Sequence, residues 1–237
     1  MKQPEVELKN GLLKLFALLM LGVIISSMIQ LKLLGNQTQI DVIESTPLTY
    51  FLSIGIFQIC AFLIPSLIWL THIGLRVSHT NAQTTVKNVV AASLLFVVLY
   101  FVANLLNQYI ERTVEIYFPQ LFDSIVQQLT TYQTLFRNEN ALGYSIIVIG
   151  VIPAIAEELF FRAGLFRFLE LKLGSFWHAA LLSSLFFAGV HMQLTQLIPI
   201  FILGMGLAVA YKYTGSIWVP IVLHMVNNVV QILLIIN

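Results

Sequence analysis

Long apolar runs constrain this chain more than any other feature. A helix needs about 20 mainly apolar residues to cross a bilayer. Runs close to that length occupy residues 11–34, 48–70, 89–106, 176–192 and 194–211, and two more begin near residues 143 and 218. Charged residues make up only 10% of the chain, against about a quarter in soluble domains. The sequence therefore predicts an all-α, polytopic transmembrane bundle of seven or eight spans.

Residues 107–140 differ from the runs on either side because charged and apolar residues alternate in them. Apolar side chains recur there at three- to four-residue spacing, at Ile110, Val114, Tyr117, Leu121 and Ile125. This spacing is typical of an amphipathic helix that lies at the membrane interface. We expect one membrane domain over residues 1–237, with amino-terminal spans and the interfacial helix in 1–140 and a polar-motif core in 141–237.

Lysine and arginine positions predict the orientation. With a cytoplasmic amino terminus, nine of the twelve fall on the cytoplasmic side, and only Lys32, Arg112 and Arg137 fall on the other, as the positive-inside rule expects. We read the first apolar run as a retained anchor, because it is too long for a signal-peptide core.

Two classes of function are disfavoured by composition. A net charge of +1 does not fit a nucleic-acid binder, which needs a clustered basic face. The single cysteine, Cys60, lies in an apolar run, so it can form no intrachain disulfide and suggests no thiolate metal site. We expect no cofactor.

The apolar run that begins near residue 143 contains three charged residues: Glu157, Glu158 and Arg162. A charge at bilayer depth costs about 3 kcal/mol on insertion scales, so each needs a partner or a function. Glu158 and Arg162 are four residues apart and share a helix face, which predicts an ion pair. Glu157 points roughly 100° away and is the carboxylate left for chemistry, or for a hydrogen bond to another helix.

Further polar residues lie deep in the last spans: His191, His224 and Asn228. Glu157 and His191 are each 17 residues from the turn at Gly174, roughly 25 Å along their helices. His224 and Asn228 share one face of the last span, roughly 12 and 18 Å from the turn near Ser216. A kink or broken helix has to absorb this difference in depth. Two imidazoles, a carboxylate and an amide suit acid–base chemistry on a water molecule.

Three motifs resemble one family. Glu157-Glu158-Leu-Phe-Phe-Arg162 is similar to EExxxR, Phe187-Ala-Gly-Val-His191 to FxxxH, and His224-Met-Val-Asn-Asn228 to HxxxN. Their order and spacing resemble the CAAX-protease and bacteriocin-processing (CPBP, or Abi) family of intramembrane glutamic endopeptidases. The resemblance covers about the last 90 residues and does not extend to the first 140.

The resemblance implies a role for each matching residue. Glu157 and His191 would bind and activate water, and His224 and Asn228 would stabilise the oxyanion. Glu158 and Arg162 would hold the site in shape. The implied activity is metal-free, CAAX prenyl endopeptidase-like hydrolysis of a membrane peptide or protein, lipidated or not, in a bacterial cell membrane.

Two alternatives stay open from the residues. Glu157, His191 and His224 could form a two-His, one-carboxylate zinc site, although HExxH does not occur. The chain could also be a non-enzymatic immunity or peptide-binding membrane protein, in which the polar cluster serves packing. A transporter fits least, because no inverted repeat is visible.

Overall fold

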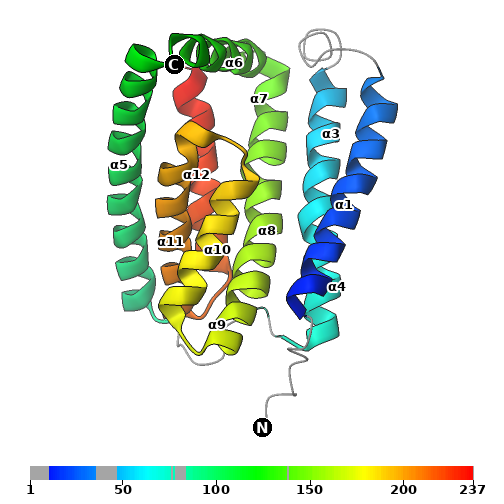
Figure 1. Cartoon of the computed structure of the whole chain (residues 1–237), viewed down its shortest axis with the longest axis vertical. Coiled ribbons are helices and arrows are strands. Elements are labelled where there is room, and N and C mark those ends of the chain that lie inside the picture. Colours follow the sequence, from blue (N-terminus) through cyan, green and yellow to red (C-terminus); the bar gives the residue numbers. More distant parts are fainter. Residues whose placement is uncertain (1–10, 36–46, 76, 78–83, 138, 237) are drawn as a thin grey trace.

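The computed structural model describes residues 11–35, 47–75, 77, 84–137 and 139–236. Within these ranges the regular structure is helical throughout, which confirms the all-α prediction (Figure 1). Lys2, Lys9 and Arg76, which entered the orientation argument, lie outside the described residues. The elements are α1 (Gly11–Leu34), α3 (Pro47–Gln58), η1 (Ile59–Leu63), α4 (Ile64–Ile73), α5 (Val86–Tyr117), α6 (Pro119–Arg137), α7 (Glu139–Ser145), η2 (Ile146–Val151), α8 (Ile152–Glu158), η3 (Leu159–Phe166), α9 (Arg167–Leu173), α10 (Phe176–Val190), η4 (Leu194–Gln196), α11 (Leu197–Thr214) and α12 (Trp218–Ile236).

Six continuous helical stretches of the described chain are long and apolar enough to cross a membrane. They are residues 11–34, 48–73, 86–117, 141–173, 194–214 and 218–236, and the shorter apolar helix α10 adds a seventh segment. This agrees with the predicted seven or eight spans. The start of α1 and the end of α12 lie at opposite ends of the bundle (Figure 1), as an odd number of passes requires.

Two of these stretches each contain a π-helical turn placed just before a proline. The π-helix η1 precedes Pro65, and η2 precedes Pro153. Proline has no backbone N–H, and its ring clashes with the carbonyl four residues earlier. A wider i→i+5 turn relieves that clash without ending the helix. Pro153 therefore cannot donate the usual α-helical hydrogen bond to the carbonyl of Ile149.

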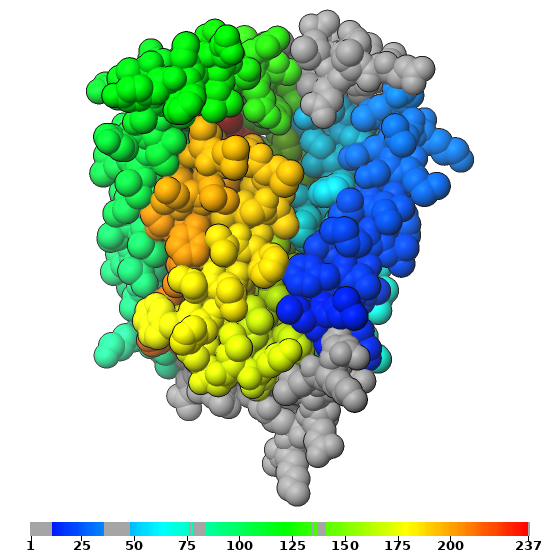
Figure 2. Space-filling model, viewed as in Figure 1, coloured from blue at the N-terminus to red at the C-terminus, as the bar shows by residue number. Residues whose placement is uncertain are grey.

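The predicted amphipathic helix is real but shorter than expected. Residues 107–117 continue the long helix α5, and only α6, from Pro119 to Arg137, crosses the end of the bundle. The prediction was wrong for Ile110, Val114 and Tyr117, because the helix ends where Pro119 forces a new start. α6 covers the end of the bundle where α12 finishes (Figures 1 and 2).

The largest buried cluster joins the amino-terminal helices to the later ones. Phe62 of η1 packs on Phe160 and Phe161 of η3, with ring centroids 5.5 and 5.9 Å apart. Phe161 in turn packs on Phe187 of α10, at 5.2 Å. This row of aromatic rings connects the α3–α4 span to the helices that carry the polar motifs.

Candidate active site

The three charges of the fourth span lie where α8 passes into the π-helix η3. Arg162 Nε lies 3.1 Å from Glu158 Oε2, and both side chains are almost fully buried, at 1% and 0% exposure. This confirms the predicted ion pair. Arg162 also donates a hydrogen bond from Nη2 to the carbonyl of Gly204, 3.1 Å away. Its guanidinium lies 4.4 Å from the ring centre of Phe187, which adds a cation–π contact.

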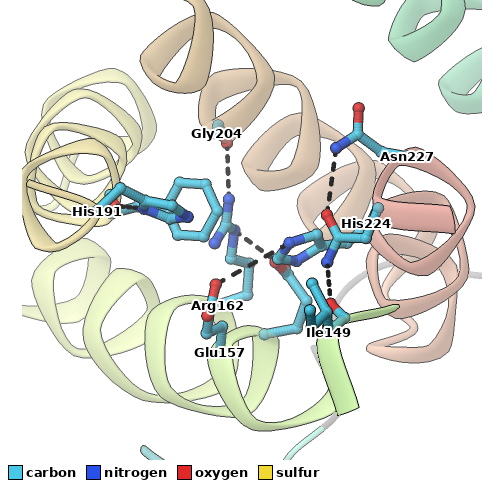
Figure 3. Close-up of polar contacts among 10 residues, drawn as sticks. Ile149, Glu157, Arg162, His191, Gly204, His224 and Asn227 are labelled. Carbon is cyan, nitrogen blue, oxygen red and sulfur yellow. Dashed lines mark hydrogen bonds and ion pairs between the residues drawn. The ribbon is translucent and has the colours of Figure 1, made fainter. Parts of the chain in front are cut away.

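Glu158 makes a second contact that the sequence reasoning missed. Its Oε1 lies 2.9 Å from Nδ1 of His224, a residue 66 positions away on α12. A carboxylate only accepts, so Nδ1 carries the hydrogen and the ring's orientation is fixed. Glu158 thus bridges Arg162 and His224, and the other ring nitrogen, Nε2, is turned towards Glu157 (Figure 3). The sequence did hold one signal for this contact. Glu158 has two carboxylate oxygens but only one predicted partner, Arg162, so a second partner could have been sought.

Glu157 is the uncommitted carboxylate, as the sequence predicted. Its side chain is 5% exposed, and its Oε2 is buried with no hydrogen-bond partner among the described residues. That oxygen lies 4.0 Å from His224 Nε2, which is too long for a direct hydrogen bond. The arrangement leaves Glu157 free to accept a hydrogen bond or a proton from a molecule in the site.

His191 closes the end of α10 and presents one free nitrogen. Its Nδ1 lies 2.7 Å from the carbonyl of Phe187. Since a carbonyl cannot donate, Nδ1 is the donor and the neutral ring keeps Nε2 as an acceptor. The next residue, Met192, has φ of 55°, so the chain turns sharply away directly after the imidazole. The ring also packs edge-on against Phe187, with centroids 4.9 Å apart.

Asn228 is held by contacts from two directions. Its Nδ2 donates at 3.3 Å to the carbonyl of Ile149, to which Pro153 cannot donate an α-helical hydrogen bond. Its Oδ1 accepts from Nδ2 of Asn227, also at 3.3 Å. Asn227 was not among the predicted site residues.

One cavity of about 730 Å³ brings together the predicted catalytic residues. Glu157, His191, His224 and Asn228 all line it, whereas Glu158 and Arg162 do not. Helix α6 forms part of the wall, through residues that include Ser124, Gln128 and Tyr132. A smaller cavity of about 170 Å³ also reaches His191, His224 and Asn228, and Asn227 lines it. The difference in depth counted from the sequence is absorbed by the fold, because His224 reaches the level of Glu157.

Among the residues that the structure describes, no group of three or more His, Cys, Asp and Glu side chains could hold a metal ion. Glu157, His191 and His224 share a cavity, but they are not grouped as a ready ligand set for zinc.

The segment that carries the polar motifs is similar to known proteins. Residues 139–230 match the family model described as "Type II CAAX prenyl endopeptidase Rce1-like". A Bacillus subtilis (strain 168) protein named "Putative membrane peptidase YdiL" is 32% identical over 142 residues, which cover 60% of this chain and 56% of the relative. The match thus spans little more than half of the relative's length. No solved structure matches. Glu157, His191, His224 and Asn228 all lie within the matched segment, residues 139–230, which is similar to the Rce1-like type II CAAX prenyl endopeptidases.

Proposed function

We propose that this chain is an intramembrane endopeptidase that hydrolyses a peptide bond of a membrane-associated or lipidated protein or peptide. One observation carries the proposal: Glu157, His191, His224 and Asn228, from three separate helical segments, line a single cavity within an apolar bundle. Such groups are expensive to keep at bilayer depth. Their convergence at one cavity is explained by hydrolytic chemistry and not by packing alone.

In this mechanism Glu157 and His191 bind the attacking water. The buried Oε2 of Glu157 has no hydrogen-bond partner in the described part of the chain, so it is available to take a proton from water. The acceptor Nε2 of His191 orients the second hydrogen. As the water oxygen bonds to the scissile carbonyl carbon, its proton passes to Glu157. The same proton then goes to the leaving nitrogen as the carbon–nitrogen bond breaks.

His224 and Asn228 would supply the oxyanion donors. The contact between Nδ1–H of His224 and Glu158 holds the ring, and in its doubly protonated form the ring would donate from Nε2–H to the oxyanion. The amide of Asn228 would turn from the carbonyl of Ile149 to the oxyanion. Donors fixed in a water-poor site are each worth about 10²–10³ in rate. Glu158 and Arg162 act through His224 and are positioning residues.

The test is cleavage of a membrane-peptide library by purified protein in liposomes, with products identified by mass spectrometry. We expect Glu157→Gln and His191→Ala to lower the cleavage rate by about 10²–10⁴-fold, the usual contribution of acid–base groups. His178→Ala is the matched control, because His178 is exposed on the same helix as His191 and hydrogen-bonds only to Ser175 in the described structure.

Three outcomes would overturn parts of the proposal. Unchanged cleavage by both variants would refute the site. Loss of cleavage on chelation, with recovery on adding zinc, would assign the reaction to a metal. Absence of any cleavage, together with a cellular immunity or binding phenotype that survives Glu157→Gln, would make the chain a non-enzymatic peptide-binding protein.

A further inference from the structure

The large cavity has an unbalanced set of charges. Its described lining contains two carboxylates, Glu111 and Glu157, and no lysine or arginine. Arg162, the cation closest in sequence to the catalytic residues, is buried against Glu158 and Gly204 outside the lining. Unless the histidines are protonated, the surface that a substrate would meet carries only negative charge.

Glu111 is turned inward by the register of α5. Ala92, Phe96, Ala103 and Val114 are the buried residues of this helix. Asn107 and Glu111 lie between Ala103 and Val114 on the same face, at successive spacings of four, four and three residues. The neighbouring charged residues Arg112 and Glu115 are exposed instead. Helix α5 therefore has an exposed face that carries charged residues, whereas the carboxylate of Glu111 lies on the face that lines the cavity.

Asn107 makes the Glu111 position a cluster of acceptors. Its Nδ2 donates to Glu111 Oε1 at 2.8 Å. The amide oxygen must then be the free end of Asn107, and it is buried with no hydrogen-bond partner among the described residues. Within the described chain no cation pairs with Glu111. Asn107 itself does not line the cavity, whereas Glu111 does. The buried Oε2 of Glu157, which has no partner among the described residues, is a second acceptor in the same cavity.

We propose that Glu111, oriented by Asn107, binds a lysine or arginine side chain of the peptide substrate, away from the scissile bond. This inference rests on the proposed endopeptidase function and names its substrate class. A donor-rich cation satisfies acceptors that the protein leaves unpaired, and charge-assisted hydrogen bonds of this kind are strong. A free carboxyl terminus in the same position would meet like charge and lose its hydration, so the preferred substrate presents a basic side chain there.

Charge reversal tests the proposal. A cleaved membrane peptide is made in versions that carry lysine, glutamine or glutamate at each position around the cut. With the unmodified protein, one position should favour lysine over glutamate by about ten- to a hundredfold in kcat/KM. Glu111→Gln should abolish the preference, and Glu111→Lys should reverse it in favour of glutamate. Glu115→Lys is the control, because Glu115 lies one turn further along the same helix, exposed, and does not line the cavity.

Binding separates this inference from the proposed function. The lysine and glutamate peptides are titrated against Glu157→Gln protein by fluorescence anisotropy, with and without Glu111→Lys. A lysine preference in binding that Glu111→Lys reverses supports the inference even if no peptide is cleaved, in which case only the endopeptidase proposal fails. Cleavage by wild type with the same preference in Glu111→Gln and Glu111→Lys would refute the role of Glu111 and leave the endopeptidase standing.

Discussion

Adjacent glutamates in one helix should respond in opposite ways to the same substitution. Glu158 is fully buried between Arg162 and His224, with contacts of 3.1 and 2.9 Å. Glu157 is also buried, but its Oε2 accepts no hydrogen bond within the described structure. We predict that Glu158→Gln destabilises the fold strongly, whereas Glu157→Gln leaves stability nearly unchanged and removes activity.

The magnitude follows from the charge that each substitution leaves behind. Removing one member of a buried ion pair costs about 3–5 kcal/mol, because the remaining charge is uncompensated. Arg162 keeps the Gly204 carbonyl and the Phe187 ring, and a desolvated cation–π contact is worth up to about 2 kcal/mol. We therefore expect a loss near the lower end, about 3 kcal/mol, for Glu158→Gln. For Glu157→Gln, which breaks no hydrogen bond to Oε2, we expect less than about 1 kcal/mol.

Reversible unfolding in mixed micelles, followed by circular dichroism, measures both values. Arg162→Met completes a double-mutant cycle with Glu158→Gln. Because the second substitution removes the charge that the first left unpaired, the double variant should lose less than the sum of the two, by about 1–3 kcal/mol. Equal losses for Glu157→Gln and Glu158→Gln, or strict additivity in the cycle, would show that the Glu158 network does not stabilise the fold.

Three further predictions use contacts elsewhere in the bundle. Gly22→Ala should cost about 1–3 kcal/mol of unfolding free energy, because its new Cβ would lie 2.0 Å from the carbonyl oxygen of Cys60. Gly143→Ala, whose Cβ would meet nothing within 4 Å, should be neutral or stabilising by up to about 1 kcal/mol. A greater loss for Gly143→Ala than for Gly22→Ala would refute the close packing of Gly22 on Cys60. Pro153→Ala restores a backbone N–H four residues after Ile149 that competes with Asn228 for this carbonyl. The poorer positioning of the Asn228 amide should slow cleavage, whereas Pro65→Ala, beside η1, should not, and equal cleavage rates for the two variants would show that Pro153 does not position Asn228. Reporter fusions should place the amino terminus in the cytoplasm and the carboxyl terminus outside, and both ends on one side would contradict the charge-based orientation.

Hydropathy was enough to predict most of the fold. A membrane span must be long, apolar and helical, so each run of suitable length could be assigned independently of the others. The first run, residues 11–34, coincides with α1. Prediction was weaker between residues 107 and 140, because an apolar spacing of three to four residues is the same in a spanning helix and in an interfacial one. The proline at position 119 marks the boundary between α5 and α6, and the prediction did not use it as a helix start.

Contacts within one helix were predictable, and contacts between helices were not. The Glu158–Arg162 pair follows from a spacing of four residues. The Glu158–His224 contact joins residues 66 positions apart, and no local spacing encodes it. The same limit applies to Asn107 and Glu111. Their hydrogen bond spans one helical turn and could have been expected, but the cavity that makes the carboxylate informative is formed by other helices.

The irregular helix that the depth count called for is found in the fourth span. Counting at about 1.5 Å per residue assumes an unbroken α-helix, whereas the fourth span contains the π-helices η2 and η3 on either side of α8. A π-helix advances less per residue, which shortens the path from Glu157 to the turn at Gly174. It also rotates the residues that follow relative to an α-helical register. The π-turn before Pro153 leaves the Ile149 carbonyl to Asn228, and η3 begins directly after the two glutamates. The irregularities that defeat a simple count therefore lie at the residues that bring Glu157, His224 and Asn228 to one level.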